Sequence, residues 1–240
     1  MHKYLIPPRV FIPAIILMIF LSSGSSVFDY IENEKSVSMQ ESIIKLPDPV
    51  LKGELTLEEA LEQRRSVRRY RNEPVEFEQV SRLLWAAQGV TQRSTGFRTA
   101  PSAGATYPLE VYLVAGNVNE LNPGLYRYLP GEHSISRLGD TDLRQDLEAA
   151  ALGQGQVGNA PAVIVIAADY SRTAQRYGER AVRYVHMETG HAGQNISLQA
   201  VSLGLGSVIV GAFEDDQVKS VLDLPANIEP LYIIPVGTPL

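Results

Sequence analysis

The sequence predicts a single α+β domain, and three observations support this prediction. Helical and strand patterns intermix along the chain without the regular strand-helix alternation of a doubly wound sheet. The chain has 240 residues with 45% apolar content, which is enough to bury one sizeable core. It contains no internal repeat. We therefore expect a single globular domain with an N-terminal extension.

The N-terminus has the layout of a secretory signal. Residues 1–26 combine Lys3 and Arg9 with a short apolar run and then several small residues. The apolar run is shorter than the roughly 20 residues that a membrane span needs. We expect a signal peptide or an N-terminal membrane anchor, which exports or anchors the domain; without a functional signal the protein is cytoplasmic. Residues 27–52 are polar and aperiodic and predict a linker to a domain over 53–240.

The domain begins with two predicted helices. Thr56 and Glu59 have the spacing of a capping box at the start of the first helix, which ends at a cluster of arginines. Apolar residues at helical spacing predict the second helix over 77–88, and Gly89 ends it.

The later elements follow from apolar runs, alternation and helical periodicity. We expect strands over 109–116, 162–170, 206–213 and 230–237, a hairpin over 124–138 that turns at Pro130 and Gly131, and helices over 141–152, 173–203 and 215–224. Residues 99–108 form a loop of small residues before the first of these strands.

Several chemistries are excluded by missing signals. A net charge of -6 argues against a nucleic-acid-binding surface, and the absence of cysteine excludes disulfides and cysteine zinc sites. The chain has no phosphate-binding P-loop and no GxSxG nucleophile turn. His186 and His191 are five residues apart, about 140° around a helix, so they cannot share a metal from one face. No metal site is predicted.

The stretch RRSVRRYR over 64–71 places five arginines around one serine. Guanidinium groups form forked, charge-assisted hydrogen bonds with phosphate, and a serine hydroxyl adds a donor. The alternative is a solvated face in which the arginines pair with glutamates such as Glu58, Glu62 and Glu73. Taken alone, the cluster is compatible with both interpretations.

Five motifs occur in a fixed order over residues 51–240: RRSVRRY, PSAGATYPLEVY, APAVIVIAADY, GHAGQNISLQAVSLGLGSVIVGAF and PLYIIPVGTP. As an ordered set they resemble the FMN-dependent nitroreductase superfamily, and most closely its SagB-type dehydrogenase branch. The resemblance implies a homodimer whose central, mostly antiparallel sheet is surrounded by helices, with a long helix at the dimer interface. It also implies two FMN molecules at that interface, each contacted by both chains.

The resemblance assigns residues to FMN. The family's RRSxR element grips the ribityl phosphate and maps onto Arg64, Arg65, Ser66 and Arg68. The PSAGA loop reaches the flavin from the neighbouring subunit and gives Pro101, Ser102, Ala103 and Gly104. Gln154 or Gln156 takes the place of a polar residue that contacts the flavin, and Val210 and Gly211 bring backbone amides toward its N5 and O4. No catalytic residue is assigned.

Four further expectations concern single positions. On the long helix, His191 and Asn195 are expected to be buried hydrogen-bonding residues. Tyr107 is a candidate for the substrate face, with an aromatic at the start of the strand as the alternative. Many nitroreductases have Lys or Arg after the closing glycine, whereas Thr238 stands here, so the RRSxR arginines must hold the phosphate.

The implied function is an FMN-dependent oxidoreductase that passes hydride from a reductant such as NAD(P)H through flavin N5 to a small electrophile, such as a nitroaromatic or a quinone. A second interpretation is an azoline dehydrogenase of peptide maturation. Those enzymes are associated with a Lys-Tyr pair, but this domain offers Arg183-Tyr184, whose guanidinium is a poor base. A non-catalytic flavin-binding protein and an enzyme that cleaves FMN are also compatible with the motifs.

Overall fold

The computed structural model describes residues 42–240. The signal or anchor predicted over 1–26 lies outside these residues, as does most of the linker predicted over 27–52. Within the described part of the chain, no helix has both the length and the apolar character of a membrane span.

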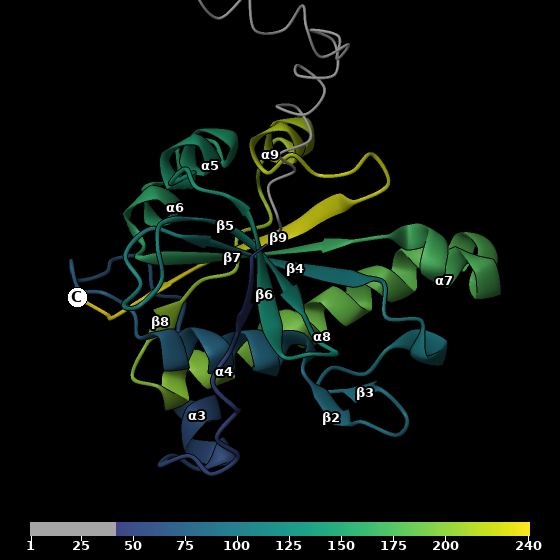
Figure 1. Ribbon diagram of the computed structural model, residues 1–240, viewed down its shortest axis with the longest axis horizontal. Helices are drawn as coiled ribbons and strands as arrows, with labels where there is room; N and C mark the ends of the chain where they lie inside the picture. Colours follow the sequence, from purple (N-terminus) through teal and green to yellow (C-terminus); the bar gives the residue numbers. More distant parts are fainter. Residues whose placement is uncertain (1–41) are drawn as a thin grey trace, which may run out of the picture. The chain divides into compact units, whose positions relative to one another are not determined.

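A seven-stranded sheet forms the centre of the domain, in the order β1-β6-β5-β4-β7-β9-β8 (Figure 1). Its strands are β1 (Ile43–Lys45), β4 (Leu109–Ala115), β5 (Gly124–Leu129), β6 (Ser134–Gly139), β7 (Ala162–Ala168), β8 (Gly206–Ser207) and β9 (Glu229–Gly237). Every neighbouring pair is antiparallel. The α+β class and the mostly antiparallel sheet are therefore confirmed.

Helices cover both faces of this sheet, which explains the continuous apolar runs in its central strands. Every residue of β7 is buried, as expected for a strand that is covered on both sides. The helices are α3 (Leu57–Gln63), α4 (Phe77–Gln88), α5 (Arg144–Ala150), α6 (Gly155–Asn159), α7 (Tyr170–Tyr177), α8 (Ala181–Ser202) and α9 (Asp215–Val221). Figure 1 shows α5, α6 and α9 on one face and α4 and α8 on the other. Each face has its own cluster of buried apolar side chains.

The two predicted helix starts are confirmed. Thr56 caps α3, and the reciprocal contacts of a capping box are present between Thr56 and Glu59. Helix α4 spans Phe77–Gln88 as predicted and ends at Gly89.

The single helix predicted over 173–203 is wrong. The structure has α7 and α8, separated at Gly178, whose φ of 56° and ψ of -136° interrupt the helical backbone. Glycine adopts positive φ without the Cβ clash that penalises other residues. Periodicity alone does not reveal this break, because apolar positions continue on both sides of it.

The strand predicted over 206–213 is also too long. Strand β8 ends at Ser207, and beyond it the chain contacts the sheet through the pair Val210 and Ile233. A hairpin of β2 (Val90–Gln92) and β3 (Phe97–Arg98) was not predicted.

The last part of the predicted linker belongs to the folded domain. Strand β1 pairs with β6, and the side chain of Leu46 is 2% exposed. The Pro47 carbonyl oxygen accepts a hydrogen bond from Ser81 Oγ at 2.6 Å and lies 2.9 Å from His133 Nε2. The boundary predicted between 52 and 53 was therefore wrong, because a three-residue strand in a polar stretch has no clear alternation.

Candidate functional site

The arginine-rich segment follows α3 and runs beside β8. The Arg64 amide closes α3 by donating to Ala60 O at 3.0 Å. Ser66 then forms a bridge with Ser207, and Val67 N donates to Ser207 O at 2.9 Å. The backbone of this segment is thus fixed by the sheet.

Most of these arginine side chains are exposed, and few have acidic partners. Arg71 lies 3.9 Å from Glu73, which is the one ion pair found for the cluster within residues 42–240. Arg65 donates to the backbone carbonyls of Glu62 and Arg64 at 2.6 and 2.8 Å. The interpretation as a paired, solvated face therefore fits Arg71 alone.

A hollow of about 340 Å³ lies against the same segment. It is lined by Ser66, Val67, Arg68, Arg69, Pro239 and Leu240. A hydroxyl and guanidinium groups therefore border one space, which is a donor set suited to a phosphate. Of the four residues predicted to bind phosphate, Ser66 and Arg68 line this hollow, whereas Arg64 and Arg65 do not.

The turn after β8 lies against the predicted glutamines. Gln154 Nε2 donates to Ala212 O at 2.8 Å and to Ala151 O at 2.9 Å, and Gln156 Nε2 donates to Gln154 Oε1 at 3.1 Å. The Gln154 amide group thus holds the turn in place.

The role predicted for the Val210 amide does not fit this turn. Val210 N donates to Ile233 O at 2.8 Å and Val210 O accepts from Ile233 N at 3.0 Å, so both backbone groups are engaged by the sheet. Gly211 is exposed, and its amide has no hydrogen-bond partner among the described residues. Of the two predicted amides, only that of Gly211 is free to meet a ligand.

The PSAGA loop has an unusual backbone conformation. Gly104, Ala105 and Tyr107 have φ angles of 62°, 55° and 46°. Positive φ costs a residue with a side chain about 1 to 2 kcal/mol, so Ala105 and Tyr107 are strained. Two hydrogen bonds support this shape: Tyr107 N donates to Ser102 Oγ at 2.9 Å, and the hydroxyls of Thr106 and Thr173 are 2.8 Å apart.

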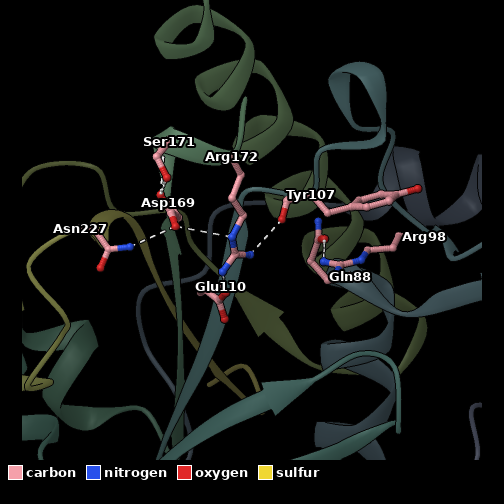
Figure 2. Close-up of polar contacts among 8 residues, drawn as sticks. All are labelled: Gln88, Arg98, Tyr107, Glu110, Asp169, Ser171, Arg172 and Asn227. Atoms are coloured by element: carbon pink, nitrogen blue, oxygen red, sulfur yellow. Dashed lines mark hydrogen bonds and ion pairs between the residues drawn. The ribbon is translucent and has the colours of Figure 1, made fainter. Parts of the chain in front are cut away.

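Arg172 fastens the end of this loop to the sheet (Figure 2). Its guanidinium donates to Tyr107 O at 3.2 Å, pairs with Glu110 and lies 3.6 Å from Asp169. Burial tends to raise the pKa of Asp169, but hydrogen bonds from Ser171 and the charge of Arg172 outweigh it and hold this pKa below its usual value. The C-terminal end of the loop is therefore held by Arg172 and its two carboxylate partners.

The ring of Tyr107 packs against Arg98, whose guanidinium carbon lies 4.5 Å from the ring centroid (Figure 2). Arg98 Nη1 also donates to Gln88 Oε1 at 2.8 Å. Burial lowers the pKa of Arg98, and the neighbouring Tyr107, Glu110 and Glu188 partly offset this effect. One face of Tyr107 is therefore occupied by protein, which favours its interpretation as a structural aromatic.

Glu188 lies behind the loop and was missed by the sequence analysis. It borders the same hollow as Ser102 and Ala103, and the residue is 2% exposed. Desolvation raises the pKa of Glu188 to about 7, although the nearby Ser102, Arg98 and Ala103 act in the opposite direction. A glutamate on a helix gives no sequence signal that a loop from elsewhere will cover it.

The two polar residues singled out on α8 differ in their surroundings. Asn195 is half-buried, and its Nδ2 donates to Thr99 O at 3.4 Å. His191 is exposed in the single chain; its predicted burial concerned a helix at a dimer interface and stays a prediction. It borders a hollow of about 300 Å³ together with Pro101, Ser102, Ala103, Tyr184, Met187 and Glu188.

The predicted site residues fall into two groups. The arginine segment, the Gln154 region and Gly211 gather around β8, whereas the PSAGA loop lies beside α7 and the first half of α8 (Figure 1). From Glu188 to the end of α8 at Ser202, about 20 Å of helix separates them. One chain does not bring the two groups together.

Comparison with known proteins gives consistent matches. The sequence model of the nitroreductase family matches residues 61–238. A protein of Methanocaldococcus jannaschii named as a nitroreductase is 47% identical over 194 residues, which cover 81% of this chain and 95% of that protein.

Two other relatives match over shorter regions. The Microcin B17-processing protein McbC of Escherichia coli is 26% identical over 57% of this chain, and the NADPH-flavin oxidoreductase of Vibrio harveyi is 31% identical over 44% of it. This chain spans about half of each relative, 52% and 48%.

Solved structures have the same fold. A protein of Ralstonia eutropha, titled as a nitroreductase, aligns with a TM-score of 0.73 and 31% identity, covering 83% of this chain and 90% of that one. One from Anabaena variabilis with the same kind of title aligns with a TM-score of 0.74 and 31% identity, covering 83% of this chain and 42% of that one.

Proposed function

Because the chain belongs to the nitroreductase family, we propose that it is an FMN-dependent oxidoreductase. In the proposed reaction, a hydride moves from a reductant such as NAD(P)H, through flavin N5, to a small electrophilic acceptor such as a nitroaromatic or a quinone. A bound flavin supplies the hydride chemistry, and the protein binds and orients the reacting groups. The similarity to the NADPH-flavin oxidoreductase of Vibrio harveyi supports the choice of cofactor.

The single observation that carries this proposal is the hollow beside the arginine segment. Ser66 and Arg68 line it, and Arg64 lies two residues before Ser66 without an acidic partner among the described residues. Charge-assisted hydrogen bonds to phosphate are stronger than neutral ones, so unpaired guanidinium groups suit a phosphate ester. We assign Arg64, Arg65, Ser66 and Arg68 to the FMN phosphate.

The free amide of Gly211 and the exposed PSAGA loop suit the flavin ring. Gly211 is free to donate to the polar edge of the ring, where charge develops on reduction. Pro101, Ala103 and Gly104 have small or compact side chains, so their backbone can approach a flat ring closely. Gln154 then acts indirectly by holding Ala212 in place.

We further propose that the working molecule is a homodimer with FMN at the interface. The two groups of site residues lie toward opposite ends of α8, so a second copy is needed to supply the loop to the arginines of the first. Closed twofold dimers are the commonest form of soluble oligomer and repeat such a shared site twice.

We place the protein near the SagB-type branch, and the similarity to McbC supports this placement. Thiazole or oxazole formation is not proposed. Tyr184 Oη accepts a hydrogen bond from Arg180 Nε at 3.2 Å, and the neighbouring Arg183 is a poor base.

We also propose that residues 1–26 export or anchor the domain. In that case a quinol or another membrane donor replaces NAD(P)H as the reductant.

The test of the phosphate site is the double substitution Arg64→Ala and Arg68→Ala in the purified protein. Each lost charge-assisted contact should cost about 1.5 to 3 kcal/mol of binding free energy, or roughly a tenfold to hundredfold loss of FMN affinity per residue. Flavin fluorescence quenching measures the dissociation constant.

Arg93→Ala is the matched control, because Arg93 is exposed on the β2–β3 hairpin, away from the hollow. Its affinity for FMN should equal that of the unaltered protein. An unchanged affinity in the double variant would remove the phosphate assignment.

Two further experiments separate the alternative functions. If NADPH bleaches the bound flavin and a nitroaromatic restores its colour, the protein is an enzyme and not a flavin carrier. Mass analysis of the flavin after turnover shows whether FMN is cleaved.

A further inference from the structure

Helix α7 has three side chains that contact the PSAGA loop. The contacts are Arg172 Nη1 to Tyr107 O at 3.2 Å, Thr173 Oγ1 to Thr106 Oγ1 at 2.8 Å, and Arg176 Nη1 to Gly104 O at 3.4 Å. Positions 172, 173 and 176 lie within about 100° around a helix. One side of α7 therefore follows the loop from residue 104 to residue 107.

The loop needs this support because its backbone is strained. Ala105 and Tyr107 have φ angles of 55° and 46°, and Tyr107 precedes Pro108, whose ring further restricts the residue before it. A conformation of this kind persists only where its surroundings impose it. Within the loop, the Tyr107 amide donates to Ser102 Oγ at 2.9 Å. The Tyr107 carbonyl is held from outside the loop, by Arg172.

The guanidinium of Arg172 is itself fixed in direction. Besides the Tyr107 carbonyl, it pairs through Nη2 with Glu110 on β4, and its Nε lies 3.6 Å from Asp169 Oδ2 (Figure 2). Each of its three nitrogen atoms thus faces a different group. A planar guanidinium fits three separate partners in this way, whereas a lysine ammonium is a single point charge on a flexible stem.

Asp169 is in turn held by donors on two sides. The residue is 8% exposed and lies between β7 and α7. Its Oδ1 accepts from Ser171 N and Oγ at 3.0 and 2.6 Å, and its Oδ2 accepts from Asn227 Nδ2 at 3.0 Å. The Asp169 amide also donates to Pro108 O at 2.9 Å. The end of the loop is therefore connected to the sheet and to the segment before β9.

A role in stability alone does not account for this arrangement. The Arg172 side chain is 39% exposed, and ion pairs that water reaches contribute little to stability. An ion pair also needs only one cation and one carboxylate. Here a further nitrogen of the same guanidinium is directed at a carbonyl of the strained loop.

We propose that Arg172 is a positioning residue, which holds residues 101–107 in the conformation that meets the flavin, with Asp169 and Asn227 as its support. The inference rests on the proposed function only for the role of the flavin. In the proposed dimer, this loop faces the flavin held by the other subunit, so Arg172 acts on that flavin through the loop.

Hydrogen exchange in the flavin-free, full-length protein tests the hold on the loop. Arg172→Lys keeps a positive charge beside the two carboxylates but loses the guanidinium fork, so the fold should remain. Exchange in peptides over 101–107 should become roughly tenfold faster, because one charge-assisted contact is lost, while peptides over 162–168 should stay protected. A general loss of stability would instead raise exchange in both regions.

Gln175→Ala is the matched control, because Gln175 is exposed on the same helix. Its exchange should equal that of the unaltered protein in both regions. Asn227→Ala keeps the test valid if Arg172→Lys does not fold. Asn227 is exposed and supports Asp169, so its truncation should speed exchange in the loop in the same direction, to a smaller extent.

FMN affinity is the second readout. If part of the protein carries the loop in another conformation, the apparent affinity falls with the fraction that can bind. Arg172→Lys should therefore bind FMN more weakly, by up to about tenfold, while its melting temperature stays close to that of Gln175→Ala. A side chain that only stabilises the fold would not separate affinity from stability in this way.

The two proposals fail in different ways. If the unaltered protein binds no FMN, the proposed function is wrong, and hydrogen exchange still decides whether Arg172 holds the loop. If FMN binds but Arg172→Lys matches Gln175→Ala in loop exchange and in affinity, the positioning role is wrong and the function stands. Faster loop exchange with unchanged FMN affinity also overturns the positioning role, because the flavin then does not need the conformation that Arg172 holds.

Discussion

At the scale of single residues, Gly206 sets how closely the arginine segment approaches the sheet. A Cβ at this position would lie 2.6 Å from Val67 Cβ and 2.7 Å from both of its γ carbons. Such contacts are far inside ordinary van der Waals separation, so any side chain here must push Val67 away. The position of Ser66 and Arg68 therefore depends on residue 206 being glycine, which has no Cβ.

Gly206→Ala should weaken FMN binding by displacing the phosphate-binding residues, and overpacking of this kind should destabilise the fold by about 1 to 3 kcal/mol. Fluorescence titration and thermal unfolding measure the two effects. Gly131→Ala is the control, because no atom lies within 4 Å of its Cβ position and the residue is in an exposed turn. If Gly206→Ala binds FMN as tightly as the control, Val67 does not fix the segment.

Local sequence patterns led to the roles proposed for the arginine segment and the PSAGA loop, whereas contacts between distant parts of the chain could not be predicted. The arginines around Ser66 and the small residues of the PSAGA loop stand next to one another in the sequence. Glu188 borders the same hollow as a loop more than 80 positions earlier in the chain, and the Val210 amide donates to Ile233 O. Neither contact leaves a periodic or compositional signal.

At the scale of elements, β1 is more than an appendage. It pairs with β6, and the following residues bring Leu46 into the core and the Pro47 carbonyl to Ser81 and His133. Burial lowers the pKa of His133, in part opposed by its contact with Pro47, so the ring favours its neutral form. This short stretch therefore links the sheet edge to α4.

A chain that begins at Gly53 should be less stable than one that begins at Ser42. It loses the burial of Leu46, worth about 1.5 to 3 kcal/mol, in addition to the pairs of β1. Thermal unfolding of the two chains measures the difference, and Leu46→Ala in the longer chain separates the apolar contribution. Equal melting temperatures would show that β1 adds nothing to the fold.

Helix ends were predicted correctly where a particular residue type marks the start or the end of the helix. The capping box at Thr56 and the glycine after Gln88 gave correct boundaries. Prediction failed at Gly178 and at β1, because a backbone break and a three-residue strand leave the apolar pattern unchanged. The antiparallel sheet was expected from the family resemblance rather than from periodicity.

At the scale of the whole molecule, the two groups of site residues lie apart along α8, and this separation can be tested with mixed dimers. One variant carries Arg64→Ala and Arg68→Ala. The other carries Gly104→Val, whose side chain would meet Tyr177 Oη at 2.7 Å and whose φ of 62° disfavours a branched residue. Each homodimer has two defective sites, but a mixed dimer has one intact site and one with both defects.

Random exchange of subunits should therefore restore about a quarter of the normal number of tight FMN sites, because half of the dimers are mixed and each of these has one intact site. Flavin stoichiometry after co-refolding measures the recovery. A mixture of either variant with itself is the control and should recover none. If the mixture recovers none either, the two groups of residues do not meet across an interface.

The arginine segment also protects the sheet. An exposed edge strand offers unpaired amides and carbonyls to strands of other molecules, which is a route to aggregation. Strand β8 ends the sheet, and Ser66 and Val67 cover its outer side through backbone contacts with Ser207. Because this shielding uses main-chain atoms, the arginine side chains can be exchanged without uncovering the edge, and the resulting proteins should remain as resistant to aggregation as the original.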